Sequence, residues 1–308
     1  MRRPLFHLLT CCAVAAAFLL LHPPRSAQAQ VTAKQVLDSI EKAKQVLLSQ
    51  QQPGGSWRTP GGGDLHEIGD TSLTLLALLN TGMTVAHPKI ELGLNWLRKQ
   101  SPNLTYEISL MIQALAAAKD GKRDYTKVAE LAAMLEDSQI RQGPNAGSWT
   151  YTKGGGGDRS NGQFAVLGLR EAQEMGVNVG LDTWRRARNH WISTQNDDGS
   201  WSYNTPKQPN GGTGSMTVAG IATLVITQAM LRAGEKELNA DGTPNCCGDP
   251  VLDKPLEDAC AWMGRYFSIK NNPGSGQWFL YYMYGLERAG RFSGRRFFAG
   301  NFRNQVLK

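Results

Sequence analysis

Four titratable side chains gather in one short glycine-rich segment of this sequence. Asp64, His66, Glu67 and Asp70 follow three consecutive glycines and lead directly into an apolar run over residues 70–80. Carboxylates beside an imidazole are residue types that serve as general acids and bases or as cation ligands. We therefore treat Asp70, Glu67 and His66 as candidate catalytic residues. The alternative is that Asp70 caps the following helix, while Asp64, His66 and Glu67 are solvated loop residues.

Aromatic residues form a second candidate site. They lie on or just before segments that we expect to be buried helices. There they either line a cavity for an apolar ligand or pack as ordinary core. The candidate ligand-binding residues are Phe164, Trp278, Tyr281 and Tyr282. Aromatic rings at helical spacing are compatible with both roles, so both remain open.

Two kinds of helix alternate along the chain and must position these residues. Residues 34–50 place Val36, Ile40 and Ala43 on one stripe, which is typical of an amphipathic helix. Residues 70–80 are apolar almost all round, which predicts a buried helix. Four further pairs repeat the alternation: 88–100 with 105–118, 124–138 with 160–174, 181–194 with 215–232, and 253–268 with 277–290. The five pairs predict an all-α protein with apolar helices inside and amphipathic helices outside.

A motif of an amide side chain, a glycine turn and a tryptophan recurs between these helices. Its copies are Gln52–Trp57, Gln142–Trp149 and Gln195–Trp201, with a degenerate copy at Asn272–Trp278. Repetition at this scale predicts a helical array. Together with Asp70-Thr-Ser-Leu-Thr-Leu-Leu-Ala-Leu78, the motif resembles the repeats of squalene-hopene cyclases and protein prenyltransferase β-subunits. It is most similar to an exported bacterial branch of prenyltransferase and squalene oxidase repeat proteins.

The resemblance covers residues 30–308 and implies an α/α toroid, in which helical hairpins form two concentric layers. This chain has five such hairpins, and we expect an incompletely closed ring. In the family, the Gln and Trp of each repeat tie adjacent outer helices together. That structural role is implied for Gln52 with Trp57, Gln142 with Trp149 and Gln195 with Trp201, and less clearly for Trp278, whose copy has Asn272 in place of the leading Gln.

The catalytic motifs of the family are only partly present. Squalene-hopene cyclases protonate an alkene with an Asp-x-Asp-Asp-Thr segment, and residues 67–71 occupy the matching place with Gly69 where the proton donor is required. Prenyltransferase β-subunits hold zinc with an Asp-x-Cys segment, and Ser72 stands where the sulfur is required. We therefore expect neither a metal nor another cofactor.

Repeats that are kept beside catalytic motifs that are not predict a non-catalytic binding module. We expect an extended apolar, isoprenoid-like ligand or a partner protein at the inner cavity. The alternative is an enzyme on the same scaffold, either cyclase-like or polysaccharide-acting, that uses the loop from Asp64 to Asp70.

The first 29 residues carry the pattern of a signal peptide. Arg2 and Arg3 precede an apolar stretch, and Ala27-Gln-Ala29 forms a cleavage site. We expect a mature protein of residues 30–308 in the periplasm or outside the cell. Its 30 basic and 26 acidic residues give a mildly positive charge, without the long basic runs of nucleic-acid-binding proteins. We predict no nucleic-acid partner and no transmembrane segment.

Export also bears on the cysteines and on the end of the chain. An oxidising compartment permits a disulfide between Cys260 and either Cys246 or Cys247.

Because the sequence stops soon after the fifth hairpin, we expect an exposed apolar edge that a second copy or a partner protein covers. A truncated gene product is the competing explanation.

Overall fold

The computed structural model describes residues 31–59, 66–204, 211–233 and 253–298. The expected signal peptide, Asp64, Cys246 and Cys247 lie outside these ranges. The chain divides into two compact units, Met1–Val46 and Leu47–Lys308. The first is described by the beginning of helix α2 (Ala33–Ser49). All further helices belong to the second unit.

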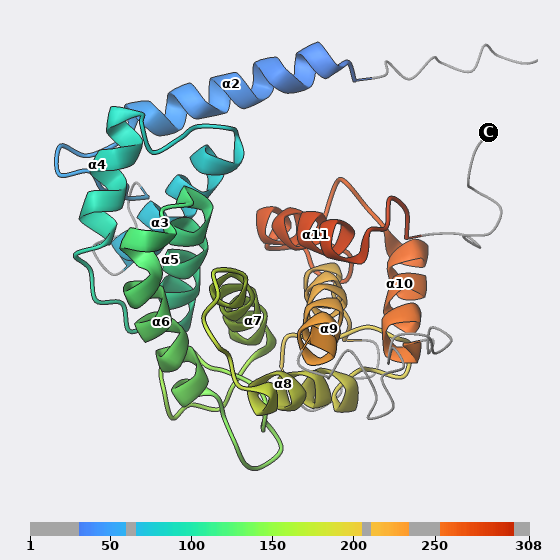
Figure 1. Cartoon of the computed structure of the whole chain (residues 1–308). Coiled ribbons are helices and arrows are strands. Elements are labelled where there is room, and N and C mark those ends of the chain that lie inside the picture. Colours follow the sequence, from blue (N-terminus) through green and yellow to red (C-terminus); the bar gives the residue numbers. More distant parts are fainter. Residues whose placement is uncertain (1–30, 60–65, 205–210, 234–252, 299–308) are drawn as a thin grey trace, which may run out of the picture. The chain divides into compact units, whose positions relative to one another are not determined.

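The described residues form ten helices and no strand, so the all-α prediction is confirmed. After α2 come α3 (Glu67–Asn80), α4 (Pro88–Leu97), α5 (Thr105–Ala118), α6 (Gly121–Ser138), α7 (Arg159–Glu174), α8 (Leu181–Ser193), α9 (Gly214–Ala233), α10 (Lys254–Tyr266) and α11 (Phe279–Ser293). Figure 1 labels them. Their bounds lie within a few residues of the predicted ones, because hydrophobic periodicity is encoded locally.

Helices of the second unit differ in burial as their sequences predict. Helices α5, α7 and α9 bury most of their residues on all sides. Helix α8 instead buries one stripe that includes Trp184, Ala187 and Trp191 and leaves Arg185 exposed on its other side. An apolar helix must be surrounded by protein, whereas an amphipathic helix needs only one covered face.

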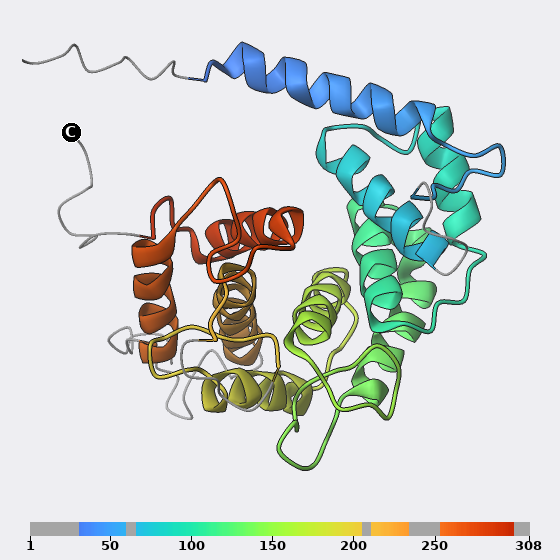
Figure 2. The same cartoon turned by 180° about the vertical axis from the view of Figure 1, so that it is seen from behind.

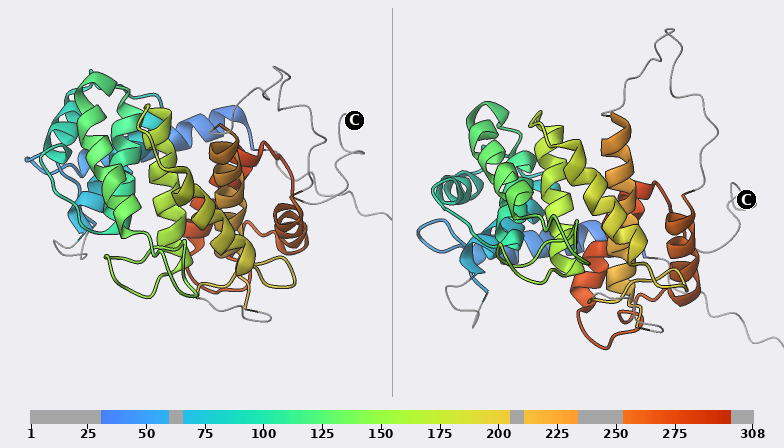
Figure 3. Two further views of the ribbon diagram at one scale, coloured as in Figure 1. Left: turned by 60° about the horizontal axis from the view of Figure 1, so that its bottom comes forward. Right: turned by 90° about the horizontal axis from the view of Figure 1, so that it is seen from below.

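The buried helices of this unit pack on one another in chain order. Helix α3 packs on α5, α5 on α7, α7 on α9, and α9 on α11. The intervening helices flank this row: α4 contacts α3, α6 contacts α5 and α7, and α8 and α10 contact α9. Figures 1 and 2 show both sets of helices, and the views in Figure 3 show α5, α7 and α9 side by side.

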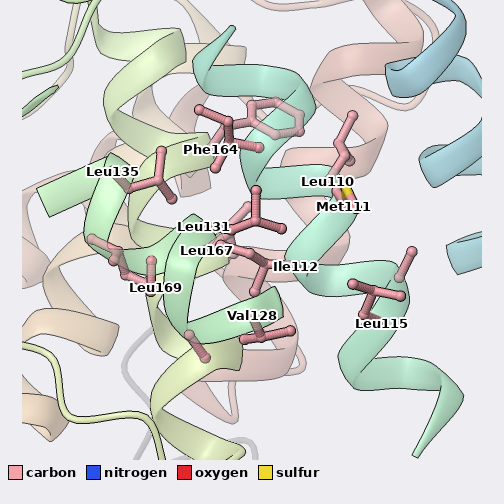
Figure 4. Close-up of a cluster of buried hydrophobic side chains, with 14 of the residues drawn as sticks. Leu110, Met111, Ile112, Leu115, Val128, Leu131, Leu135, Phe164, Leu167 and Leu169 are labelled. Atoms are coloured by element: carbon pink, nitrogen blue, oxygen red, sulfur yellow. The ribbon is translucent and has the colours of Figure 1, made fainter. Parts of the chain in front are cut away.

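One core cluster illustrates how a flanking helix closes the seam between two buried ones. Leu131 and Leu135 of α6 point toward Met111 of α5 and Leu167 of α7 (Figure 4). Each of these side chains is almost completely buried. Burying a leucine or methionine side chain contributes about 1.5–3 kcal/mol, so the cluster firmly fixes α5 beside α7.

Three tryptophans bind the ends of flanking helices. Trp57, Trp149 and Trp201 are buried, and each indole Nε1–H donates to a backbone carbonyl close to the end of the preceding helix. The acceptors are Leu47 O at 2.6 Å, Leu135 O at 2.7 Å and Trp191 O at 2.9 Å, respectively. The three expected structural tryptophans therefore make equivalent contacts.

Three glutamine amides complete these contacts by reaching the first turn of the next flanking helix. Gln51, Gln139 and Gln195 use Nε2 as the donor. The acceptors are Lys89 O at 2.8 Å in α4, Thr183 O at 3.1 Å in α8 and Pro255 O at 2.8 Å in α10. We call each set of one Gln and one Trp a clamp. Two clamps tie α6 to α8 and α8 to α10, and the first ties the segment from Leu47 to Trp57 to the start of α4.

Two of the glutamines predicted for this role were wrong. Gln51 and Gln139 make the contacts, whereas the Nε2 group of Gln52 turns back to Gln50 O at 3.4 Å and Gln142 lies exposed in a loop. The amide must reach both the next helix and the carbonyl of the turn glycine, as Gln195 does with Gly199 O at 2.9 Å. Gln52 and Gln142 lie nearer to the Gly-Ser-Trp turn. From there the amide does not reach both the next helix and the turn glycine.

Candidate functional site

The first turns of five helices meet at one pocket. Its volume is about 660 Å³, within the range of about 300–1,000 Å³ that is typical of small-molecule sites. The lining residues come from the start of α3, α5, α7, α9 and α11 and from the loops before α7 and α9: His66, Gly69, Asp70, Leu73, Leu104, Tyr106, Glu107, Leu110, Tyr151, Ser160, Tyr203, Ser215, Met216, Trp278 and Tyr281. The row of buried helices thus brings together residues more than 200 positions apart.

Only part of the predicted acidic loop faces this pocket. His66 is the N-cap residue of α3, and Asp70 lies in the first turn, where its Oδ2 accepts from Thr59 N at 2.7 Å. Glu67 does not line the pocket, because its carboxylate pairs with Arg58 at 2.7 Å. That hydrogen bond lowers the pKa of Glu67. The idea that Asp70 caps α3 is wrong, since the helix begins three residues earlier.

The most buried acid in the pocket is one that sequence reasoning missed. Glu107 is 6% exposed and lies in the first turn of α5. Burial raises the pKa of its carboxyl, and the charge of His66 and the backbone N–H groups of Leu104 and Asn103 oppose that rise. A signal was present: Glu107 is the sole charged residue in the otherwise apolar helix over 105–118.

Gly69 and Glu107 face each other across neighbouring helices. A Cβ atom added at Gly69 would lie 3.7 Å from Glu107 Cγ, an ordinary van der Waals contact. Gly69 also lines the pocket. At Gly69, where the resemblance implies a proton donor, α3 therefore has no side chain. The neighbouring acid is Glu107, which comes from α5.

The predicted aromatic residues divide between the pocket and the core. Tyr281 and Trp278 line the pocket, whereas Tyr282 is fully buried in the core beside α9. Phe164 packs behind the pocket wall, with its ring 4.2 Å from that of Tyr106 and stacked on that of Tyr284 at 5.7 Å between centroids. Tyr282 is therefore not a ligand-binding residue of this pocket, and Phe164 supports the wall.

Trp278 does not make the fourth clamp. Its side chain is 70% exposed, and its backbone is left-handed with φ of 62°. A bulky residue adopts this conformation at a cost of about 1–3 kcal/mol. Asn272, in contrast, is buried and fastens the start of α9 by accepting from Ser215 N at 2.8 Å. The degenerate copy thus keeps its amide in the structure and turns its tryptophan to the pocket.

A chain of hydroxyl groups from Tyr151, Tyr203 and Ser160 also lines the pocket. Tyr151 and Tyr203 hydroxyls are 3.4 Å apart, and Tyr203 is 3.4 Å from Ser160 Oγ. Ser160 Oγ donates to Asp158 Oδ1 at 2.5 Å, and Asp158 also caps α7 through Asn161 N. Burial raises the pKa of Tyr203 to about 12, so the phenol is neutral at physiological pH.

Metal and thiol chemistry find little support in the part of the chain that the structure describes. No group of three or more His, Cys, Asp or Glu side chains there is arranged to hold a metal ion. Cys260 lies buried in α10, and burial raises the pKa of its thiol to about 11. Its expected partners, Cys246 and Cys247, lie outside the described residues, so the disulfide stays a prediction.

One described helix, α9, is long and apolar enough to cross a membrane by length and composition. It is mostly buried inside the protein, which equally fits the core helix that its packing on α7, α8, α10 and α11 makes it.

Comparison with known proteins adds no identity. No protein family model matches the chain, and no curated protein matches it.

Proposed function

We propose that this protein is a non-catalytic binding module of the α/α-toroid superfamily, which takes up an elongated apolar molecule in the pocket at the helix starts. The observation that carries the proposal is the pocket itself. Leucine, methionine and aromatic side chains dominate its lining, and the polar side chains are those of His66, Asp70, Glu107, Ser215 and the hydroxyl chain. Such a composition is typical of sites for apolar ligands that need orientation.

The superfamily assignment rests on the clamps. Three equivalent sets of Gln and Trp contacts join successive flanking helices, and buried helices alternate with them. A repeated structural unit that packs mainly on its neighbours is the expected basis of a helical array. Under this proposal the protein is exported and binds a molecule that it meets outside the cytoplasm.

Two features favour binding over catalysis. Gly69 lacks any side chain where the resembling cyclases hold an acid. Glu67 is held by Arg58, which removes it from the pocket wall. An enzyme on this scaffold, the alternative reading, retains Asp70, His66 and the newly found Glu107 as acid and base candidates.

Uptake of a neutral apolar probe tests the proposal. Diphenylhexatriene is elongated, carries no head group and fluoresces in apolar surroundings. We expect saturable binding to the mature protein, and native mass spectrometry of freshly purified protein to show a co-purified apolar molecule. Absence of both would refute the proposed function.

A pair of glycine variants localises that binding. Gly69→Leu places a side chain in the pocket, where the nearest atom to its Cβ is Glu107 Cγ at 3.7 Å. Gly121→Leu places the same side chain at the exposed start of α6, where nothing lies within 4 Å. We expect the first to weaken diphenylhexatriene binding about tenfold or more and the second to leave it unchanged. Equal effects would place the probe elsewhere.

A protein partner is the second candidate, and the last helical pair favours it. Large apolar side chains there are widely exposed, with Leu280 at 80%, Ile269 at 65% and Phe267 at 50%. Light scattering of the mature protein distinguishes a dimer from a monomer. If a second copy covers these residues, Ile269→Glu with Leu280→Glu should yield a monomer.

A further inference from the structure

The polar groups of the pocket divide unevenly between hydrogen-bond donors and acceptors. The helix starts would ordinarily offer free N–H groups, but here the protein uses them. Thr105 N donates to Tyr151 O at 3.0 Å, Asn161 N to Asp158 Oδ1 at 2.9 Å, and Ser215 N to Asn272 Oδ1 at 2.8 Å. The starts of α5, α7 and α9 therefore have fewer donors left for an anionic ligand.

The hydroxyl groups of the pocket are also hydrogen-bonded within the protein. Ser160 has one hydroxyl hydrogen, and the 2.5 Å contact shows that it goes to Asp158. The Tyr203 hydroxyl lies 3.4 Å from Ser160 Oγ and 3.4 Å from the Tyr151 hydroxyl, and either phenol of that pair can donate to the other. Tyr281 likewise donates to Gln163 Oε1. Each of these hydroxyls therefore already has a hydrogen-bond partner within the protein, and each retains a lone pair that can accept from a ligand.

Both carboxylates of the lining add acceptors. Within the part of the chain that the structure describes, Asp70 accepts one backbone N–H, from Thr59 to Oδ2 at 2.7 Å, which leaves Oδ1 as a further acceptor. Glu107 is buried against Gly69, and the missing side chain there leaves its carboxyl open to the pocket. No lysine or arginine is among the described residues that line the pocket. His66 and Trp278, which also line the pocket, are exposed and can donate to a ligand.

We propose that the pocket selects amphipathic amines: molecules with an apolar chain and a protonated amino group that donates to Glu107 and Asp70. The apolar chain lies along Leu73, Leu110 and Met216, and the aromatic residues Tyr106 and Trp278 line the same pocket. An ammonium group supplies three donors and no acceptor, which complements this lining. Aromatic faces add attraction for such a cation. This inference rests on the proposed function, because it names the class of ligand for the same pocket.

Three probes with one chain and different heads test the inference on the wild-type protein. Octylamine, octanol and octanoate are titrated by calorimetry at neutral pH. We expect octylamine to bind about tenfold or more tightly than octanol, because a charge-assisted hydrogen bond is roughly twice as strong as a neutral one. Octanoate should bind most weakly. Equal binding of amine and alcohol, or tightest binding of octanoate, would overturn the inference.

A variant pair assigns the preference to one residue. Glu107→Gln removes the charge inside the pocket, whereas Glu130→Gln removes one on the exposed side of α6. We expect Glu107→Gln to abolish the preference for octylamine while octanol still binds, and Glu130→Gln to preserve it. If Glu107→Gln does not fold, Asp70→Asn serves instead and should reduce the preference. An unchanged preference in the folded pocket variant would contradict the assignment.

Diphenylhexatriene separates this inference from the proposed function. If that probe binds and the amine has no advantage, the pocket is a general apolar site and the inference fails alone. If neither diphenylhexatriene nor any octyl probe binds, the proposed function fails and the inference falls with it.

Discussion

Replacing one tryptophan by phenylalanine in two copies of the repeat should have very different effects on stability. Trp201 is fully buried, and its Nε1–H donates to Trp191 O at 2.9 Å. Trp278 occupies the corresponding place in the last copy but is 70% exposed. The same chemical change therefore removes a clamp contact in one case and a solvent-facing indole in the other.

The expected loss at Trp201 follows from two terms. Without the indole N–H, the Trp191 carbonyl becomes a buried acceptor with no donor, which costs about 1–3 kcal/mol. The smaller ring leaves a cavity against α9, where Trp201 packs so closely on Gly220 that a Cβ there would lie 2.5 Å from the indole. That cavity costs about 1 kcal/mol more. We expect the free energy of unfolding to fall by about 2–4 kcal/mol.

Urea denaturation followed by far-UV circular dichroism measures this difference. The Trp201→Phe protein should unfold at clearly lower urea, with a Tm lower by about 5–15 °C. Trp278→Phe should change the free energy of unfolding by less than about 0.5 kcal/mol, as surface substitutions usually do. Equal destabilisation by both substitutions would refute the assignment of the clamp to buried copies.

Three further predictions concern charge. Asp124→Asn should lower the free energy of unfolding by about 3–5 kcal/mol in urea denaturation, because Asp124 is buried and accepts from Arg98 at 2.7 and 2.8 Å; Asp137→Asn, in an exposed pair, should not change it measurably. Burial lowers the pKa of His190 from 6.5 to about 4, so on acidification the unfolded chain binds a proton there at a higher pH than the folded protein does. The free energy of unfolding should therefore fall by up to about 3 kcal/mol between about pH 6.5 and 4. His190→Asn should remove this part of the pH dependence. Finally, since burial raises the pKa of Glu107, calorimetry should show the advantage of octylamine over octanol fading on acidification at a higher pH than for an exposed carboxyl.

Helices were predictable from the sequence because their evidence is local. The stripe over residues 34–50 and the apolar run over 105–118 specify one exposed and one hidden helix within a few turns each. Pro88 at the first turn of α4 likewise marks a helix start without reference to the rest of the chain.

The clamps were predictable in kind but not in register. The three tryptophans of the clamps were all identified, since Gly-Ser-Trp is conspicuous between helices. Choosing between Gln51 and Gln52 required the position of Lys89 O in the next flanking helix. A run of three glutamines carries no information about that position, so nothing in the run distinguishes Gln51 from its two neighbours.

The pocket was the least predictable feature, because its residues meet only through packing. Tyr106, Tyr151 and Tyr203 belong to different helices or loops, and each looks ordinary in its own segment. Even the acidic loop was misleading in part, as Glu67 has a local partner in Arg58 that withdraws it from the pocket. Whether a residue lines the pocket depends on where the first turn of its helix lies relative to the other helices. Hydrophobic periodicity does not specify that position.

Gly69 gains a different meaning once Glu107 is placed. As a sequence feature it marks a missing acid, and that alone would suggest a pocket without a carboxylate on this wall. In the structure a Cβ fits at Gly69 without a clash, so space does not exclude an acid there. A carboxylate at position 69 would instead lie beside those of Asp70 and Glu107, and like charges at such a site raise one another's pKa. The glycine therefore keeps Glu107 accessible and free of a third neighbouring carboxylate, which is the arrangement that an acceptor for a ligand's ammonium group requires.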